Sequence, residues 1–388
     1  MEYYNGFVHS EKNSFAVINQ GLVHTSGINT LSSLPRTGQQ GDTMATRAAY
    51  PFSAIVGQDQ MKLALILNTI SPGIGGVLIR GEKGTAKSTA VRALARLLPD
   101  RVVVKGCRCG CLLSNRREYC TECAERYASS EPEGVTMPME VVELPLNSTE
   151  DRVSGTLDLE RAISEGRKSF EPGILARANG NILYVDEVNL LDDHIVDLLL
   201  DSAAMGVNYV EREGVSFQHP SSFILVGTMN PEEGDLRPQL LDRFGLMVDV
   251  VGETDEAKRK EIIRRRLAFE RDRDGFIESY RESDDELRRR ISEAKANVDS
   301  VSIGEDALDL SVRISIKLGI DGHRADLTMI RAACALAAWE GRGEASADDV
   351  AKVAPMVLAH RMRKNPFDEA SIDAKGLSEC LSELVSSK

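Results

Sequence analysis

The amino-acid sequence predicts an α/β fold, with a parallel sheet between helices, followed by an all-helical domain. Three observations predict it. A glycine-rich loop joins an apolar, strand-like stretch at 76–80 to a helix-like stretch at 88–98. Two further apolar runs, 181–187 and 223–230, end in polar side chains, as buried parallel strands do at the edge of a sheet. Between residues 307 and 362, apolar residues recur at helical spacing, which indicates three amphipathic helices.

The loop after the first strand has the composition of a phosphate-binding loop. A nucleoside triphosphate needs many N–H donors, a cation and a hydroxyl for Mg2+, and the loop offers its backbone, Lys87 and Ser88. The pattern G-x-x-x-x-G-K-[ST] is met except at Ala86, where a methyl group is tolerable only if the backbone is open to L-residues. The alternative, a glycine-rich turn with a surface lysine, is disfavoured by the strand and helix on either side. The residues predicted to bind ATP are Gly81, Glu82, Lys83, Gly84, Thr85, Ala86, Lys87, Ser88 and Thr89.

The second strand ends in two carboxylates. Asp186 is predicted to anchor Mg2+ together with Ser88, and Glu187 to polarise the water that attacks the γ-phosphate. The alternative is a solvated strand end without a catalytic role. The presence of Lys87 and Ser88 earlier in the chain favours the catalytic interpretation.

Three polar residues after the third strand complete the predicted site. Asn230 is expected to hold the attacking water and to sense the γ-phosphate, its alternative role being a turn residue before a proline. Arg243, within Leu-Leu-Asp-Arg-Phe, is expected to reach the nucleotide of a neighbouring subunit as an arginine finger, with Arg237 as a second interface cation. The alternative for these arginines is an exposed pairing with a nearby aspartate.

The order of these motifs resembles that of the AAA+ ATPases, and longer strings resemble the ATPase (I) subunit of magnesium chelatase and its cobaltochelatase relatives. The resemblance covers residues 51–365, with a less familiar patch at 255–300. The strings that carry it are Leu-Pro-Leu at 144–146, Thr-Glu-Asp-Arg-Val-Ser-Gly-Thr-Leu-Asp at 149–158, the run 184–201 with Asp-Glu-Val-Asn-Leu-Leu-Asp-Asp-His, Val-Glu-Arg-Glu-Gly at 210–214, and Val-Gly-Thr-Met-Asn-Pro-Glu-Glu-Gly at 226–234. Strings of this length are far more specific than the phosphate loop alone.

The resemblance implies an AAA+ P-loop NTPase core with β-hairpin insertions and a C-terminal all-α lid domain. It also implies a second nucleotide-sensing arginine at a helix start in the lid, a position that Arg324 matches; the alternative is a capping or surface arginine. Hairpins near 150–172 and over 208–217 are implied to contact partners. The candidate contact residues, for which a solvated hairpin tip is an equal alternative, are Glu211, Arg212 and Glu213.

The activity implied by the resemblance is ATP hydrolysis that drives insertion of Mg2+ or Co2+ into a tetrapyrrole such as protoporphyrin IX. The implied partners are further copies in a homo-oligomeric ring, expected to be a hexamer, a von Willebrand-type D subunit and a large porphyrin-binding H-type subunit. The alternative is a MoxR-like AAA+ chaperone that matures another metalloenzyme with a von Willebrand-type partner. A non-catalytic nucleotide-gated scaffold is a third class, which the presence of Lys87, Asp186, Glu187 and Arg243 disfavours.

A cysteine-rich insert is predicted at 107–123. Four thiolates can wrap Zn2+ tetrahedrally or hold an iron–sulfur cluster, and C-x-x-C is a good half-site. The first three cysteines are spaced more tightly, so the sequence does not choose which two of them would bind. The alternative is thiol redox control of activity. The insert holds Cys107, Cys109, Cys111, Cys120 and Cys123.

Composition bounds the function further. The chain of 388 residues is 42% apolar and carries a net charge of −13, which argues against a motor that tracks nucleic acid. No apolar run reaches about 18 residues, so no membrane span is expected.

The charged stretch 254–300 is predicted to be a solvated, ion-paired helical surface. His194, at the start of a helix predicted over 192–204, is expected to suit the helix end more than a metal.

Domain boundaries follow from these patterns. An ATPase domain is expected over 44–252 and a helical lid over 253–366, with a hinge near 252–254. Residues 1–43 have few charges and no periodicity, and we expect a disordered arm there; residues 367–388 are expected to form a loose tail. The protein is expected in the cytoplasm, the alternative being a plastid if residues 1–43 are a transit segment. Translation from Met44 instead of Met1 is a further hypothesis.

Overall fold

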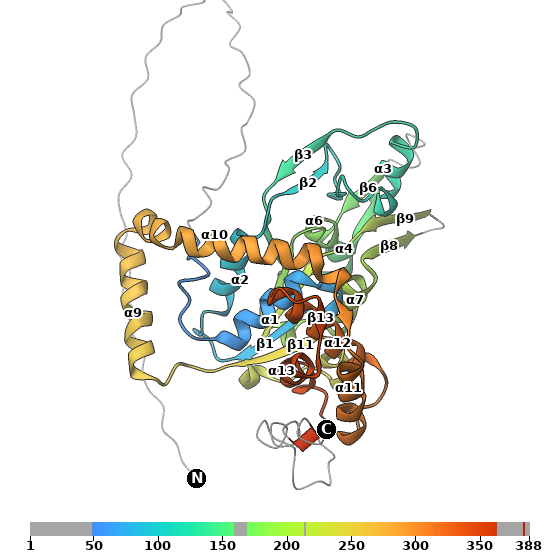
Figure 1. Ribbon diagram of the computed structural model, residues 1–388. Helices are drawn as coiled ribbons and strands as arrows, with labels where there is room; N and C mark the ends of the chain where they lie inside the picture. Colours follow the sequence, from blue (N-terminus) through green and yellow to red (C-terminus); the bar gives the residue numbers. More distant parts are fainter. Residues whose placement is uncertain (1–48, 159–168, 213–214, 363–382, 385–388) are drawn as a thin grey trace, which may run out of the picture. The chain divides into compact units, whose positions relative to one another are not determined.

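The computed structural model describes residues 49–158, 169–212, 215–362 and 383–384 (Figure 1). The predicted arm at 1–43 and nearly all of the predicted tail lie outside the described residues. The central sheet has five parallel strands in the order β11-β1-β10-β7-β4. Their bounds are β1 (Val77–Gly81), β4 (Val141–Glu143), β7 (Ile182–Val185), β10 (Ile224–Met229) and β11 (Leu246–Val250). The predicted α/β fold class is confirmed.

Alternating side chains of the strands serve two hydrophobic cores. Along β1, Val77 and Ile79 pack on one face of the sheet and Leu78 on the other. In β7, Leu183 likewise lies in the second core, between Ile182 and Tyr184 of the first. Because successive strand residues point to opposite faces, a nearly continuous apolar run is needed when both faces are covered. The apolar runs in the sequence therefore indicate a sheet that is covered by other elements on both faces.

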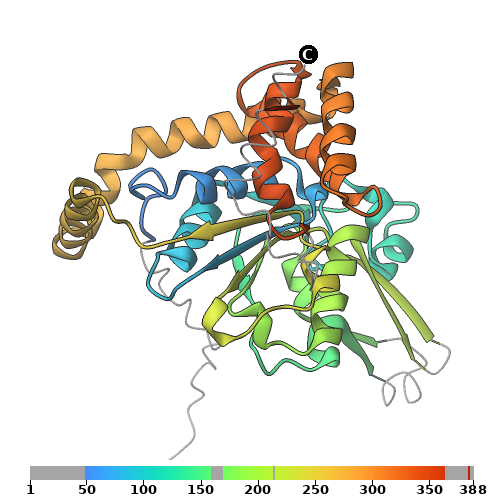
Figure 2. The same ribbon diagram turned by 90° about the horizontal axis from the view of Figure 1, so that it is seen from below.

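Helices cover the two faces unequally. The first face carries α1 (Asp59–Ile70) and α2 (Lys87–Leu97), and the helices of the lid pack against α1 on this same side (Figure 2). The second face carries α6 (Ile174–Ala178), α7 (Asp193–Met205) and α8 (Pro238–Leu241). Asp192 occupies the N-cap position of α7 without a side-chain capping bond, and the acidic Asp193 lies in the first turn of the helix.

Three antiparallel strand pairs project from this core. The predicted hairpin at 208–217 is present as β8 (Val207–Arg212) and β9 (Val215–Pro220), with Glu213 outside the described residues. A second pair joins β5 (Gly155–Asp158) to β6 (Ser169–Pro172), whose tip also lies outside them. The cysteine-rich insert lies between the paired strands β2 (Arg101–Val104) and β3 (Gly134–Met137) and contains α3 (Thr121–Arg126). The remaining elements of this part are α4 (Glu150–Ser154) and the 3-10 helices η1 (Pro72–Ile74), η2 (Arg116–Glu118), η3 (Val188–Leu190) and η4 (Pro231–Glu233).

The C-terminal part is helical, as predicted. Two charged helices, α9 (Glu256–Arg271) and α10 (Arg273–Asn297), are followed by α11 (Glu305–Lys317), α12 (Arg324–Trp339) and α13 (Ala347–Leu358). Ser346 and Asp349 form the capping box that begins α13, because each side chain accepts the backbone N–H of the other residue. The apolar residues that recur at helical spacing in the sequence thus predict the positions of the last three helices. Short elements between them are η5 (Val298–Ser300) and the paired strands β12 (Ser302–Ile303) and β13 (Glu344–Ala345).

A buried arginine joins the lid to the sheet domain. Arg361 follows α13, has a side chain only 1% exposed, and donates from Nε to Asp242 Oδ1 at 3.1 Å. Its other nitrogens donate to backbone carbonyls that include those of Phe244 and Gly245. The neighbouring His360 donates from Nε2 to the carbonyl of Phe244 at 2.9 Å. The segment that carries the predicted arginine finger is therefore held by the lid.

Candidate functional site

A large cavity lies at the carboxyl ends of β1, β7 and β10. Its volume is about 920 Å³, within the usual range for a small-molecule site. In open parallel sheets, ligands bind in this position because loops and helix N-termini converge there. Of the loop residues predicted to bind ATP, Gly81 and Glu82 do not line the cavity. Those that line it are Lys83, Gly84, Thr85, Ala86, Lys87, Ser88 and Thr89.

The phosphate-binding loop contains one strained residue. Ala86 has φ 63°, in the left-handed region. The backbone there is therefore not in a conformation open to L-residues, which was the condition for tolerating a methyl group at this position. That conformation costs an L-residue about 1–2 kcal/mol, which glycine would avoid. Gly81 has a different constraint, since a Cβ there would lie 2.1 Å from the carbonyl oxygen of Val250. The loop is therefore packed against β11 at one end and strained at the other.

Two lysines of the loop have different partners. Lys87 Nζ donates to the carbonyl oxygens of Gly81 and Glu82, and burial lowers its pKa. Lys83 Nζ lies 3.0 Å from Glu187 Oε1 and 2.6 Å from Glu233 Oε1. Both lysines line the cavity. Phosphate oxygens entering it would compete with backbone carbonyls for Lys87 and with carboxylates for Lys83.

Asp186 is held in place by two hydroxyl groups. Its Oδ1 accepts from Thr228 Oγ1 at 2.5 Å and from Tyr184 Oη at 2.9 Å. Thr228 also accepts the backbone N–H of Glu187 at 3.1 Å, so one threonine positions both acids. Sequence reasoning missed it, although a hydroxyl inside the apolar run of β10 was the signal. The carboxylate of Asp186 and the hydroxyl of Ser88 both line the cavity and are oxygen donors of the kind that Mg2+ prefers.

Asn230 is buried and lines the same cavity. Its Oδ1 accepts the backbone N–H of Glu232 at 3.3 Å, so it also caps the short helix η4 before which it stands. The turn role considered from sequence is thus present. The residue nonetheless follows the central strand β10 and lines the same cavity as the two acids that follow β7.

The predicted finger and sensor arginines lie outside the cavity lining. Arg243 pairs with Asp201 at 2.6 Å and with Asp197 at 3.0 Å, both on α7. Arg324 pairs with Asp242 at 3.0 Å. A role for Arg243 at the nucleotide of another subunit, and for Arg324 at the nucleotide of its own chain, would require each to exchange its carboxylate partners. Arg237 pairs with Asp193, not with either aspartate nearest to it in sequence.

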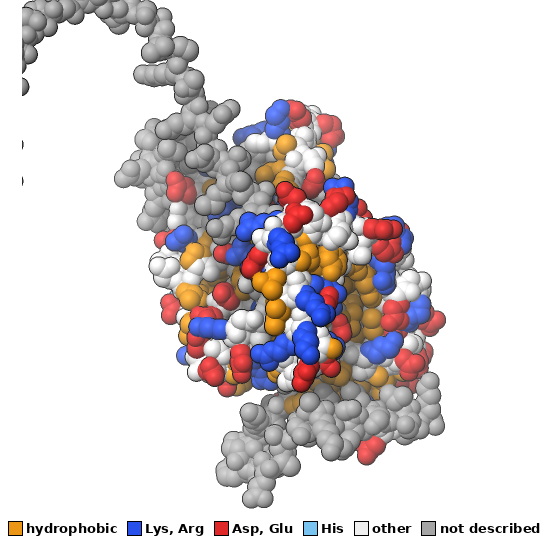
Figure 3. Space-filling view, turned by 90° about the vertical axis from the view of Figure 1, so that its left-hand side faces the viewer, with side chains coloured by type: hydrophobic (Ala, Val, Ile, Leu, Met, Phe, Trp, Pro, Cys, Tyr) orange, Lys and Arg blue, Asp and Glu red, His pale blue; other side chains and the backbone are white. Residues whose placement is uncertain are grey.

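One part of the cavity lining was not predicted. Tyr50 and Ile55 line it from the segment before α1, and Ile262 and Ile263 line it from α9. The sequence predicts a solvated, ion-paired surface for this helix, and its ion pairs are present. The face that carries α9 exposes hydrophobic side chains between basic and acidic ones, with Ile263 54% exposed (Figure 3). The two adjacent isoleucines among the charges were the signal for a binding wall.

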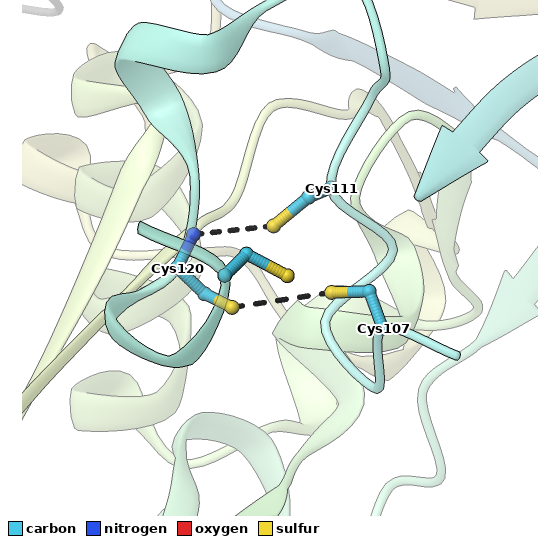
Figure 4. Close-up of side chains that lie close together, drawn as sticks. Cys107, Cys111 and Cys120 are labelled. Carbon is cyan, nitrogen blue, oxygen red and sulfur yellow. Dashed lines mark hydrogen bonds between the residues drawn. The ribbon is translucent and has the colours of Figure 1, made fainter. Parts of the chain in front are cut away.

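A second cluster lies in the cysteine-rich insert. The sulfur atoms of four cysteines lie within 4.8 Å of one another, and three of the four residues are buried. Cys107 and Cys111 point from one loop toward Cys120 at the start of α3 (Figure 4). Hydrogen bonds from neighbouring thiols, that of Cys109 foremost, lower the pKa of Cys107 well below its usual range. The group consists of Cys107, Cys111, Cys120 and Cys123, and among the described residues neither His194 nor any carboxylate joins such a group.

Comparison with known proteins agrees with this geometry. Residues 121–244 match the model of the AAA domain (dynein-related subfamily), and residues 308–379 match that of the AAA lid domain. The chain is 54% identical to the magnesium-chelatase subunit ChlI homolog of Methanocaldococcus jannaschii, over 88% of this chain and 93% of the relative. It is 52% identical to the magnesium-chelatase 38 kDa subunit of Rhodobacter capsulatus, over 85% of this chain and 93% of the relative.

A solved assembly is similar as well. A subunit in the complex between BchI and BchD of magnesium chelatase, determined by cryo-electron microscopy, is 49% identical, with a TM-score of 0.50. The match covers 86% of this chain and all of that one. Among the described residues no helix is long and apolar enough to cross a membrane.

Proposed function

The chain belongs to the magnesium-chelatase I-subunit family of AAA ATPases, and from that premise we propose that it hydrolyses ATP to drive insertion of Mg2+ into a tetrapyrrole by a partner subunit. The observation that carries the ATPase part is the cavity at the strand ends, where Lys87, Ser88, Asp186 and Glu187 line one space. The relatives' names carry the chelatase part. They favour it over the MoxR-like chaperone role.

The residues of the cavity divide the chemistry between them. Lys87, on the helix N-terminus that ends the loop, would balance the charge of the β- and γ-phosphates. Glu187 would orient and polarise the attacking water, while Thr228 accepts the backbone N–H of Glu187 and donates to the carboxylate of Asp186. Ser88 and Asp186 would hold Mg2+, which supplies positive charge to the phosphates when bound. Asn230 would bind the water from the next strand.

Binding of ATP would first have to release Glu187 from Lys83. The two side chains are 3.0 Å apart, and Lys83 also contacts Glu233. Phosphate oxygens are alternative partners for Lys83, because a lysine binds phosphate as a point charge. The proposed base would therefore become available as the nucleotide enters the loop.

A ring of copies would complete the site. Arg243 lies outside its own chain's cavity, on the segment that Arg361 fixes to the lid, and would reach the nucleotide of a neighbour. Arg324 would contact the nucleotide from the lid after leaving Asp242.

We propose a hexamer, a von Willebrand-type D subunit and a large porphyrin-binding subunit as partners, contacted through the hairpins β5–β6 and β8–β9. Cytoplasmic location remains a prediction, and Zn2+ at the cysteine cluster is a separate hypothesis because nucleotide hydrolysis does not need it.

Capture of the partners tests this function. The Glu187→Gln variant, loaded with ATP, serves as bait in a lysate of the organism that makes the chain, and a Lys87→Ala bait controls for nucleotide dependence. Recovery of a very large porphyrin-binding subunit and a von Willebrand-type ATPase, both only with the first bait, supports the chelatase motor. Recovery of a different metalloenzyme without either would move the protein to the chaperone class.

A further inference from the structure

The four clustered cysteines have the spacing of a metal-binding group along the chain. Three residues separate Cys107 from Cys111 and two separate Cys120 from Cys123, both within the usual interval between paired zinc ligands. The loop and the start of α3 bring the two pairs together (Figure 4). Cys109 lies between the first two, but its sulfur is outside the group. The structure thus distinguishes the cysteines of the first cluster where the sequence did not.

The distances between sulfurs fit one metal ion. Four thiolates placed tetrahedrally at about 2.3 Å from Zn2+ are about 3.8 Å apart. The Sγ atoms of Cys107 and Cys120 are 3.9 Å apart, and all four lie within 4.8 Å of one another. A disulfide would need about 2.05 Å, and all four cysteines are free thiols. Donors this close also leave no room for the eight iron and sulfide atoms of a four-iron cluster.

Neighbouring groups hold the sulfurs and their loop. The backbone N–H of Cys120 donates to Cys111 Sγ at 3.1 Å, a bond that stabilises a thiolate ligand. Asn179 donates from Nδ2 to the carbonyl oxygens of Cys109 and Gly110, at 3.3 Å and 2.8 Å. Gly110 has φ 59°, the left-handed conformation that a tight turn between ligands requires. The loop is therefore ordered by the protein around it.

The cluster also packs against the strands of two hairpins. Its cysteines pack with Phe170 of β6, Val210 of β8 and Phe217 of β9, and the rings of Phe170 and Phe217 stack at 4.1 Å. Thr121, the first residue of α3, donates from Oγ1 to the carbonyl of Gln218 and accepts the backbone N–H of the same residue. A group that holds the four cysteines in place would therefore also hold both hairpins in place.

We propose that Cys107, Cys111, Cys120 and Cys123 bind one Zn2+ as four thiolates, and that this ion holds the insert against the strands of the hairpins β5–β6 and β8–β9. Binding releases the thiol protons and involves no change of oxidation state. The ion is structural, because four protein ligands leave no open position for catalysis. Its consequence for partner contact rests on the proposed function, whereas its presence and its effect on the hairpins do not.

Metal content is the first test. The full chain, purified under reducing conditions after growth with zinc, is expected to carry one zinc per chain by elemental analysis. Cys107→Ser and Cys120→Ser should fall below about 0.2 zinc per chain. Cys109→Ala and Cys334→Ala are the matched controls and should keep the ion, because their sulfurs lie outside the group. Zinc-free wild-type protein, iron in place of zinc, or loss of zinc from Cys109→Ala would overturn the assignment.

Two measurements on the wild-type chain remain decisive if a variant fails to fold. Replacement of zinc by Co2+ should give the intense visible bands of a tetrahedral thiolate site, and weak octahedral bands would refute it. Hydrogen exchange should then be compared with and without metal. We expect amides of 207–212 and 215–220 to exchange at least about tenfold faster without it, while α12 is unchanged. Unchanged hairpin exchange would refute the structural role, and neither readout depends on ATP hydrolysis or on any partner.

Discussion

Replacement of Asp242 by asparagine is expected to weaken the attachment of the lid to the sheet domain. The carboxylate accepts from Arg361 Nε at 3.1 Å and from Arg324 Nη1 at 3.0 Å, so it joins two lid arginines to the end of α8. Arg361 is 1% exposed, and among the described residues Asp242 is the carboxylate with which it pairs. Loss of the charge would leave a buried cation without a counter-ion.

The size of the effect follows from burial. Removing one partner of a fully buried ion pair costs about 3–5 kcal/mol. Two features reduce this figure, since Asp242 is 47% exposed and Arg361 also donates to the carbonyls of Val357, Phe244 and Gly245. Asparagine also keeps one acceptor oxygen. We therefore expect a loss of about 2 kcal/mol in the free energy of unfolding.

Tryptophan fluorescence provides the assay. Trp339 is the only tryptophan of the chain, lies at the end of α12 and stacks with Arg290, whose Cζ is 4.0 Å from the ring centroid. Its emission during urea unfolding therefore reports on the lid. The matched control is Asp249→Asn, which breaks a pair with Arg80 that is 37% and 50% exposed, and which should cost less than about 1 kcal/mol. Equal losses in the two variants would refute the reasoning, because burial of the arginine would then not matter.

Four further predictions concern acid stability and the site. Burial lowers the pKa of His360 to about 3, from an ordinary value of 6.5. The unfolded chain therefore binds the proton first as the pH falls, and urea titrations should show stability decreasing by about 1.4 kcal/mol per pH unit between those values, a slope that His360→Gln should flatten. Lys87→Ala should weaken nucleotide binding at least about 100-fold in calorimetry, and retained affinity would contradict the loop assignment. Glu187→Gln should bind ATP normally but hydrolyse it about 100-fold to 10,000-fold more slowly, whereas full turnover would place the base elsewhere. Mixing Arg243→Ala with Lys87→Ala protein should restore part of the ATPase rate at hybrid interfaces, and no recovery at any ratio would oppose action between subunits.

Local signals in the sequence predicted much of the fold. The apolar runs located β1, β7 and β10 because a strand buried on both faces needs consecutive apolar residues. The capping pair Ser346 and Asp349 located the start of α13, and the alternation around residues 208–217 located a hairpin. Each of these features is decided within a few residues, so a single sequence is enough to predict it.

Features that depend on distant residues were not predictable. The apolar wall from Ile262 and Ile263 is visible only once α9 is placed beside the cavity, because isoleucines among charges resemble an ordinary exposed helix. Arg324 was expected at the nucleotide, yet its pairing with Asp242 joins positions 82 residues apart. The spacing of the cysteines could not exclude Cys109, since which sulfurs meet depends on the turn at Gly110.

The shared hydrophobic core limits how the lid can move. Met329 and Ala332 of α12 belong to the same core as Leu65 of α1 and Val77 of the sheet. A rigid-body hinge opening of the lid would expose this interface to water. The free-energy cost would be about 25 cal/mol for each Å² of apolar surface. Packed helices instead shift by sliding a small distance along one another, with their side chains still interdigitated. A lid movement driven by ATP hydrolysis would then be a shear movement of α12 along α1.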